Sequence, residues 1–489
     1  MGGNEMVLDE IDYMNVFHYF EEISNIPRGS GNNQPMSDYL VAFAQEHELD
    51  YTRDEALNVI ITKEATKGYE NCPTMILQGH MDMVCEKKSD SDHDFLTQGL
   101  ELCIEDDYLF ANGTTLGGDD GIAVAYGLAI LSSDSIEHPR LEVVITTDEE
   151  VGLIGATNLD VSSLKGKYMI NLDSEEEDIL LTGCAGGMRA VCKLPLSYKK
   201  MEGKKVSIIV KGLLGGHSGS EIDKNRVNAD ILLGRLLFDL RKHSFELLSV
   251  SGGLKDNAIP REALAELVVK EEDSYELINE VKFLLEKYKN EYRVNEPDLT
   301  ILIQQGEEKE YLVMDEKTKK NVLFMLLQTP NGIQVMSPNI NGLVESSLNL
   351  GVLKMEEGEI EFSYSVRSSS SSYKWFLNDK LQNLVTFLGG TYEYHGEYPG
   401  WEYKKNSKLR DIYSNAYREL YGKEIKVETI HAGLECGIIA EKIKDLDIIS
   451  VGPNMFDIHT TEERLSISST KRVFDLLLKV LKDFAEATK

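Results

Sequence analysis

The sequence predicts an α/β domain, a sheet with covering helices, that is interrupted by an inserted α+β domain. In the first third of the chain, short β-like runs alternate with helical runs, as in a sheet that helices cover. From about residue 187 the pattern changes, and after residue 396 Gly, Ser and helix signals return. We therefore expect a first part at residues 1–186, an inserted domain at 187–396 and a second part at 397–489. Such an insertion is feasible because chain termini and loop ends often lie close together.

Four strands and one buried helix are expected in the first part. The strand-like runs are NVIITK, PTMILQGH, LEVVITTDEE and YMINLD, at residues 58–63, 73–80, 141–150 and 168–173. Between the second and third runs, residues 119–133 follow a Gly pair and have the length and the Ala, Leu and Ile content of a buried helix. Active sites of such sheets form at the carboxyl ends of strands, so the polar tails of these runs are the first candidates for function.

The inserted domain shows its own strands and helices. KKVSIIVKG, at residues 204–212, is typical of a strand, and residues 229–240 place apolar side chains at the helical period. A charged helical stretch follows at 275–292. The expected last strand is EIEFSYSVRS, at 359–368, where apolar residues alternate with a polar face that ends in Arg367. The chain closes with an amphipathic helix at 468–487.

Composition excludes several classes of partner. The formal charge of −32 comes from 83 acidic against 51 basic residues, a balance that repels phosphate backbones and anionic membranes. Nucleic acid and membrane partners are therefore not expected. The six cysteines are scattered without a CxxC pair, and no signal sequence or membrane-spanning apolar run is recognised. These features favour a cytoplasmic location.

Two short motifs in the first part contain candidate ligands. His80 and Asp82 end a strand-like run, and because side chains two positions apart face the same way, Asp82 can hold the ring of His80 in the orientation of a metal ligand. The alternative is that His80 and Asp82 form a hydrogen-bonded pair at the surface without a metal. Asp119 and Asp120 lie between a Gly pair and Gly121, where they either bind a cation or cap the expected helix.

Further candidates follow later strands. Glu149 and Glu150 come after an apolar strand and Asp148, and three carboxylates in a row favour either a bound metal or a solvated turn. Asp173 ends the next strand, and His459 lies in GPNMFDIHTTEE. A lone histidine is usually structural. The series HxD, GGDDG, TDEEVG, NLDSEEE and a late histidine, mostly at strand ends, nevertheless indicates a metal site.

With these motifs, the sequence resembles the co-catalytic zinc peptidases of the aminoacylase and carboxypeptidase G group over nearly its whole length. Within that group NLDSEEE, GCAGG, GGHSG, DNAIPREA and HAGLECG look like the aminoacyl-histidine dipeptidases. The resemblance implies a zinc-peptidase catalytic domain, interrupted by a lid domain for substrate binding and dimerisation. It also implies a homodimer that hydrolyses dipeptides with free termini, of the Xaa-His type and with broad specificity.

Carried over residue by residue, the resemblance implies two metal ions bridged by Asp119. His80 and Asp173 would complete one site, and Glu150 and His459 the other. Each zinc then has three protein ligands and a shared position for water, as catalytic zinc requires. Cobalt and manganese also suit carboxylate and imidazole ligands.

The same resemblance assigns roles in the reaction. Glu149 becomes the general base that takes a proton from the metal-bridging water, and Asp82 supports His80. The Asp119–Asp120 peptide bond is expected to be cis. In the lid, His217 would stabilise the oxyanion and Arg367 would bind the free carboxylate of the dipeptide.

Asn257 and the loop at Gly433 would help to hold the substrate. One departure is the DIHTTEE segment, where the family often has proline before the histidine and Ser-Pro after it. This departure leaves His459 as the candidate ligand and affects the geometry of the loop around it. Three alternatives stay open: an N-acyl-amino-acid deacylase, a tripeptidase of the same group, and an inactive metal-binding or scaffold protein.

Overall fold

The computed structural model describes residues 7–488, and the contacts of the chain divide it into two compact units. The first unit contains Met1–Cys184, Trp401–Thr429 and Leu434–Lys489, and the second contains Ala185–Gly400 and Ile430–Gly433. Residues 185–186, 397–400 and 430–433 were expected in the catalytic domain, whereas their contacts group them with the second unit.

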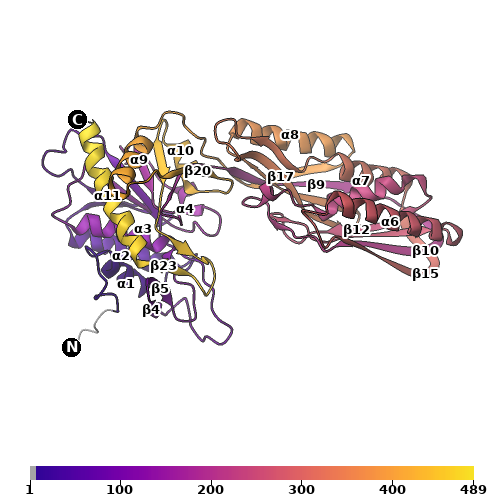
Figure 1. Ribbon diagram of the computed structural model, residues 1–489, viewed down its shortest axis with the longest axis horizontal. Helices are drawn as coiled ribbons and strands as arrows, with labels where there is room; N and C mark the ends of the chain where they lie inside the picture. Colours follow the sequence, from indigo (N-terminus) through magenta and orange to yellow (C-terminus); the bar gives the residue numbers. More distant parts are fainter. Residues whose placement is uncertain (1–6, 489) are drawn as a thin grey trace. The chain divides into compact units, whose positions relative to one another are not determined.

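The first unit, at the left of Figure 1, is built on a mixed sheet. This sheet has eight strands in the order β1-β2-β6-β3-β7-β21-β8-β20. Its strands are β1 (Asp50–Arg53), β2 (Val59–Lys63), β3 (Met75–His80), β6 (Leu141–Thr146), β7 (Tyr168–Asn171), β8 (Ile179–Cys184), β20 (Lys426–Ile430) and β21 (Asp447–Ser450). Strand β3 pairs in parallel with both β6 and β7. The carboxyl ends of these three strands therefore lie at one edge of the sheet, which is where the polar tails were expected to meet.

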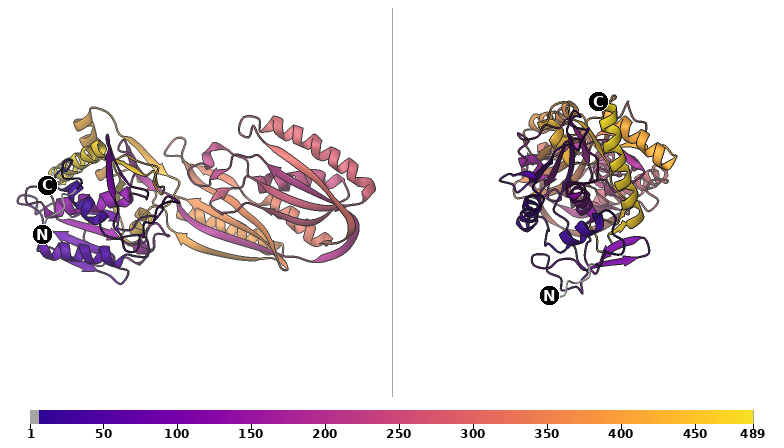
Figure 2. Two further views of the ribbon diagram at one scale, coloured as in Figure 1. Left: turned by 90° about the horizontal axis from the view of Figure 1, so that it is seen from below. Right: turned by 90° about the vertical axis from the view of Figure 1, so that its left-hand side faces the viewer.

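Helices cover this sheet, and a smaller sheet stands beside it. The helices are α1 (Val16–Ser24), α2 (Gln34–Glu46), α3 (Gly118–Ser132), α4 (Ile154–Asn158), α9 (Lys408–Tyr421), α10 (Glu435–Lys442) and α11 (Ile467–Thr488). The small sheet has the order β22-β23-β5-β4, formed by β4 (Leu102–Glu105), β5 (Tyr108–Ala111), β22 (Met455–Phe456) and β23 (Arg464–Ser466). The long helix α11, yellow in Figure 2, runs along the outside of the unit and buries one apolar stripe.

All positions of β3 and β6 are buried, as expected for central strands whose two faces are both covered. The predicted strands and the buried helix are confirmed, with shifted ends. The third strand stops at Thr146 rather than at residue 150, because Asp148 takes a positive φ of 49° and turns the chain. Helix α3 contains non-helical backbone angles at Asp119 and Asp120.

The second unit contains a nine-stranded antiparallel sheet with the order β15-β10-β14-β12-β17-β18-β9-β19, and β16 pairs with β17. Its strands are β9 (Gly186–Pro195), β10 (Tyr198–Lys211), β12 (Glu246–Gly252), β14 (Ala263–Val269), β15 (Thr300–Met314), β16 (Gly332–Met336), β17 (Val344–Glu356), β18 (Glu359–Ser368) and β19 (Thr391–Tyr398). A separate two-stranded ladder joins β11 (Gly216–His217) to β13 (Ala258–Ile259). The strands predicted at 204–212 and 359–368 are confirmed as parts of β10 and β18.

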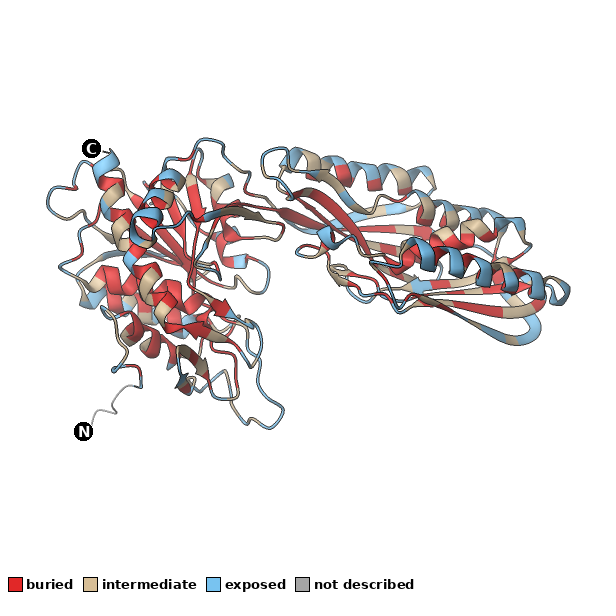
Figure 3. Ribbon diagram, viewed as in Figure 1, coloured by how far each residue is buried: buried red, intermediate tan, exposed pale blue. Residues whose placement is uncertain are grey.

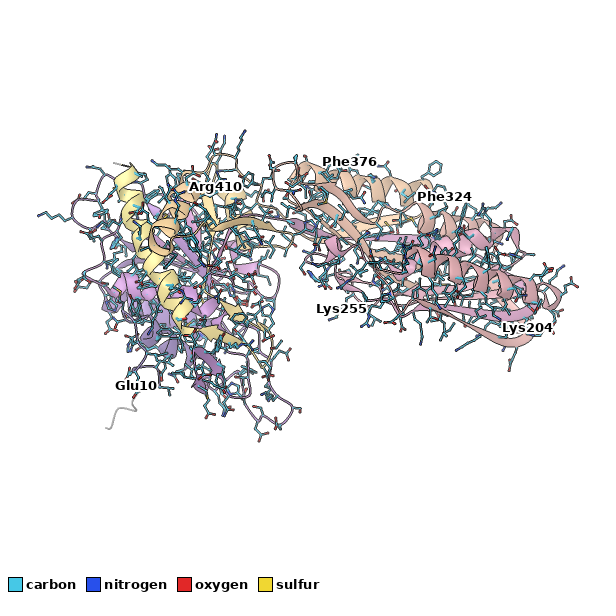
Figure 4. The ribbon with its side chains drawn as sticks, viewed as in Figure 1. Glu10, Lys204, Lys255, Phe324, Phe376 and Arg410 are labelled. Carbon is cyan, nitrogen blue, oxygen red and sulfur yellow. The ribbon has the colours of Figure 1, made fainter. Side chains whose placement is uncertain are left out.

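Helices lie along this sheet and share one apolar core with it. They are α5 (Ala229–Asp239), α6 (Glu271–Glu291), α7 (Glu316–Gln328) and α8 (Ser371–Phe387), with short 3₁₀ turns η1 (Ile222–Lys224) and η2 (Leu240–Lys242). Figure 3 shows that α6, α7 and α8 turn buried positions toward the sheet and exposed positions outward. The side chains of Phe324 and Phe376 project from the outer faces of α7 and α8 (Figure 4).

Within residues 7–488, no helix combines the length and the apolar character that crossing a bilayer requires.

Candidate metal centre

The candidate ligands gather at the edge where β3, β6 and β7 end. His80 is the last residue of β3, Glu149 and Glu150 lie in the loop after β6, and Asp173 lies two residues beyond β7. His459 comes from the loop between β22 and β23. Parallel pairing of β3 with β6 and β7 brings the segments after these three strands together. The tertiary fold adds the loop that contains His459.

Asp119 lies between the two imidazoles. Its Oδ1 is 3.1 Å from Nε2 of His80, and its Oδ2 is 3.2 Å from Nε2 of His459. The same His459 nitrogen is 2.9 Å from Oε1 of Glu150, and His80 Nε2 is 3.9 Å from Oδ1 of Asp173. Each carboxylate oxygen of Asp119 thus belongs to a different group of potential ligands.

The donor set fits divalent metal ions. Among the described residues, the groups His80–Asp119–Asp173 and Asp119–Glu150–His459 each have ligand atoms within 4.8 Å of one another. A third group, His80–Glu149–Glu150, also meets this distance. Imidazole and carboxylate donors in groups of three are typical of zinc and related ions in catalytic sites. The carboxylate shared by the first two groups makes the arrangement suitable for two neighbouring ions.

The electrostatics of the centre also favour a cation. Burial raises the pKa of Glu149 to about 8, and it raises the pKa of Asp173 well above its ordinary value, with the nearby Asp120 and Asp119 carboxylates adding to the rise. Hydrogen bonds to Asp119 and Glu150 raise the pKa of His459 to about 10. Carboxylates packed at this density are stabilised in the ionised form by nearby positive charge. Divalent cations supply that charge.

The peptide bond between Asp119 and Asp120 is cis, which confirms the expectation. Neither side chain caps helix α3, whose first position is preceded by Gly117 without a side-chain cap bond. Instead, Oδ2 of Asp120 accepts a hydrogen bond of 3.1 Å from the backbone N–H of His80. The capping alternative for this Asp pair is therefore wrong.

Asp82 holds His80 and also reaches the loop after β6. Its Oδ1 lies 3.4 Å from Nδ1 of His80, and the carbonyl oxygen of Asp82 lies 3.1 Å from the same nitrogen. Its carboxylate accepts hydrogen bonds from the backbone N–H groups of Glu149 and Glu150, at 3.0 and 3.4 Å, and from Oγ of Ser30 at 2.8 Å. The sequence pattern predicted the first contact but not those with the loop.

The second unit contains the remaining candidates. Arg367, on β18, is buried, and its Nη1 donates to the hydroxyl of Tyr398 at 3.3 Å. His217, on β11, accepts hydrogen bonds at Nδ1 from the backbone N–H groups of Gly219 and Ser220. Burial lowers the pKa of His217, and the charge of Arg367 lowers it further. Arg367 and His217 are therefore close enough to interact electrostatically.

Asn257 and Gly433 lie in the same unit. The carbonyl oxygen of Asn257 accepts from the backbone N–H of Ser218 at 2.8 Å, next to His217. A Cβ on Gly433 would approach the ring of Tyr398 to 2.7 Å, so the loop needs glycine to pass the ring. The structure thus places all four candidates of this unit, while their roles toward a substrate stay predictions.

Several buried polar residues near the metal centre were not predicted. Glu435 accepts hydrogen bonds from Gln78 and Thr146, and burial raises its pKa to about 7. Arg28 and Glu463 both contact the segment that precedes Asp119. Glu435 lies within HAGLECG and Glu463 four positions after His459, so the motifs contained both, but no local pattern distinguishes them from surface glutamates.

Known proteins are similar to this chain in sequence and in fold. The model of peptidase family M20/M25/M40 matches residues 76–483. The cytosol non-specific dipeptidase of Escherichia coli (strain K12) is 35% identical over 485 residues, which cover 97% of this chain and 99% of the relative.

Among solved structures, the aminoacylhistidine dipeptidase from Vibrio alginolyticus is similar with a TM-score of 0.91 and 33% identity, covering 96% of both chains. A tripeptidase from Staphylococcus aureus is 18% identical with a TM-score of 0.54, covering 96% of this chain and 98% of the other, which shows the fold alone. The chain therefore belongs to peptidase family M20/M25/M40.

Proposed function

We propose that this protein is a metal-dependent dipeptidase that hydrolyses dipeptides with free amino and carboxyl termini. The observation that carries the proposal is the position of Asp119, whose two carboxylate oxygens face His80 and His459 separately. The relatives named as dipeptidases, which align over nearly the whole chain, support the choice of substrate.

The residues that would hold the metals form two sets. His80 and Asp173 would bind one ion, Glu150 and His459 the other, and Asp119 both. We propose zinc, and cobalt or manganese would suit the same donors. When bound, such ions polarise the scissile carbonyl and make water a better nucleophile.

Glu149 is proposed as the general base. Its carboxylate is buried beside the two ligand sets and belongs to a group with His80 and Glu150. It would take a proton from the attacking water and deliver that proton to the leaving amine. A carboxylate beside the attacking water can serve in both directions, because it first accepts the proton and then returns it.

The second unit is proposed to recognise the substrate. Arg367 would bind the free carboxylate of the dipeptide, since a guanidinium forms paired charge-assisted hydrogen bonds with a carboxylate. Its buried Nε has no hydrogen-bond partner among the described residues, which leaves a donor for a ligand. His217 would stabilise the oxyanion, with Asn257 and Gly433 shaping the surroundings.

The remaining parts of the proposal concern location and assembly. We propose a cytoplasmic homodimer that acts on small peptides, with neither nucleic acid nor membrane as partner. The E. coli relative is named for the cytosol, and the charge of −32 disfavours anionic partners.

The test is hydrolysis of a substrate panel by enzyme loaded with defined metals. The panel contains alanyl-histidine, β-alanyl-histidine, other dipeptides, a tripeptide and an N-acylated amino acid. We expect turnover of dipeptides that disappears on chelation and returns with zinc. Preference for the acylated substrate would indicate a deacylase, and preference for the tripeptide a tripeptidase. Absence of metal-dependent hydrolysis throughout would favour an inactive homologue.

A further inference from the structure

The buried carboxylate of Glu463 joins the segment that leads into Asp119 to the loop that carries His459. Glu463 is 3% exposed and ends the loop between β22 and β23 that contains His459. Its Oε2 accepts hydrogen bonds from the backbone N–H groups of Leu116 at 2.8 Å and Gly117 at 3.0 Å. Its Oε1 accepts from Gly118 at 2.8 Å, and the N–H of Asp119 lies 3.5 Å away.

This geometry is that of an anion-binding nest. Successive backbone N–H groups converge on one anion when a residue in the chain takes the left-handed conformation, and Gly117 does so with φ of 66°. Here the anion is a side chain that lies 345 positions from Gly118 in the sequence. Both oxygens of Glu463 accept from N–H groups, as an ionised carboxylate does, and such charge-assisted bonds are stronger than neutral ones.

The opposite side of the same segment is held by Arg28. This buried guanidinium donates to the carbonyl oxygen of Gly117 and, at 3.2 Å, to that of Met81. A Cβ on Gly117 would come within 2.5 Å of Nη2 of Arg28. The segment before Asp119 is therefore fixed between a carboxylate on its N–H side and a guanidinium on its carbonyl side.

The loop that carries His459 needs such an anchor. The side chain of His459 is 45% exposed, and its backbone takes a positive φ of 61°. Beyond Glu463, strand β23 pairs with β5 through Leu465 and Leu109. The loop is thus attached to the body of the unit at Glu463 and at the strand that follows it.

We propose that Glu463 is a positioning residue for the metal centre, which fixes Asp119 and His459 relative to one another by joining the segment before Asp119 to the loop that contains His459. The proposal rests on the metal assignments made above. It assigns Glu463 no contact with metal or substrate. The expected consequence of losing it is weaker binding of both ions, because Asp119 is shared between the two ligand sets.

The test compares Glu463→Gln with Glu462→Gln. Glu462 is the neighbouring residue, but its side chain is 65% exposed and pairs with Lys88, also exposed, at 3.0 Å. Surface ion pairs of this kind contribute little to the stability of the folded protein. Zinc is titrated into each metal-free protein in competition with a chelator, and circular dichroism records whether each variant is folded.

We expect Glu463→Gln to bind zinc about 10- to 100-fold more weakly, as is typical when a residue that supports metal ligands is lost. At limiting zinc its kcat should fall while KM for a dipeptide stays near the wild-type value. Glu462→Gln should match the wild type in both measurements. Glu463→Asp keeps the charge on a shorter side chain and should recover part of the zinc affinity.

Wild-type zinc affinity in folded Glu463→Gln would overturn the proposal, as would an equal loss in Glu462→Gln. If Glu463→Gln does not fold, Glu463→Asp decides: a folded Asp variant with wild-type affinity overturns the proposal, and weakened affinity supports it. A wild-type protein that binds no zinc would contradict the proposed function instead.

Discussion

The carboxylate of Asp82 accepts a hydrogen bond of 3.0 Å from the backbone N–H of Glu149. The same oxygen lies 3.4 Å from Nδ1 of His80. One side chain therefore orients a candidate metal ligand and the backbone of the candidate base. Burial acts to raise its pKa, but the hydrogen bonds from His80, Ser30 and the backbone of Glu149 and the charge of His80 together hold the pKa below its ordinary value, so the group accepts hydrogen bonds as a carboxylate at neutral pH.

Replacing Asp82 with Asn is expected to lower kcat by about 10- to 100-fold with a smaller change in KM. The amide carries no negative charge to raise the basicity of the metal-bound His80 imidazole, and only its oxygen can accept from Glu149. Steady-state kinetics at saturating zinc measures the effect. Ser30→Ala is a suitable control, because it removes one hydrogen bond to the other oxygen of Asp82 and leaves the charge of Asp82 in place. If kcat fell as far in Ser30→Ala as in Asp82→Asn, the proposed role of the Asp82 charge would be contradicted.

The second prediction separates the base from the ligands. Glu149→Ala should retain two metal ions and lose about 10²- to 10⁴-fold in kcat, the usual contribution of a general base. Glu150→Ala and His459→Ala should lose metal as well, because each removes a donor from the group around Asp119. Metal analysis of purified proteins distinguishes the cases. An equal loss of metal in all three would show that Glu149 is itself a ligand.

The third prediction concerns recognition of the substrate carboxylate. Arg367→Ala should lower kcat/KM for a dipeptide by about 10- to 100-fold while zinc content is unchanged, because charge-assisted hydrogen bonds are lost. Arg367→Lys should recover part of the activity. A dipeptide amidated at its carboxyl end should react poorly with the wild type and be little affected by the substitution. Equal wild-type rates on free and amidated dipeptides would exclude this role.

The fourth prediction concerns stability and pH. Burial, reinforced by the charge of Arg367, lowers the pKa of His431 to about 3. The unfolded chain takes up a proton at His431 near pH 6.5, whereas the folded protein does not until about pH 3. His431 therefore makes the folded state less stable as the pH falls through this interval, by about 2 kcal/mol between pH 7 and pH 5.

His431→Gln removes this titration, so its free energy of unfolding should fall less between pH 7 and pH 5 than that of the wild type. Urea unfolding can be followed in the second unit by Trp375, in a Trp401→Phe background that leaves a single tryptophan. In the wild type, Nε2 of His431 lies 2.7 Å from Oγ of Ser347. The comparison uses the pH dependence, so a constant loss of unfolding free energy from this missing hydrogen bond cancels. The same pH dependence in both proteins would refute the prediction.

Local patterns were sufficient to predict much of the catalytic fold. The apolar runs ending at His80, Thr146 and Asn171 are strands because their side chains are buried on both faces, and the runs themselves are visible in the sequence. Parallel pairing of consecutive βαβ segments then places the residues that follow them at one edge. The gathering of His80, Glu149 and Asp173 could therefore be anticipated.

The sequence by itself determined which residue types stand at the ends of the strands, and only the tertiary structure decided how they are held. Asp119 faces His459, and Glu463 binds the N–H groups before Asp119, across separations of 340 and 345 residues. Likewise, residues 430–433 belong to the second unit although the chain on both sides belongs to the first. Periodicity reports which face of an element is apolar, whereas these contacts depend on where distant loops meet, and no local pattern contains that information.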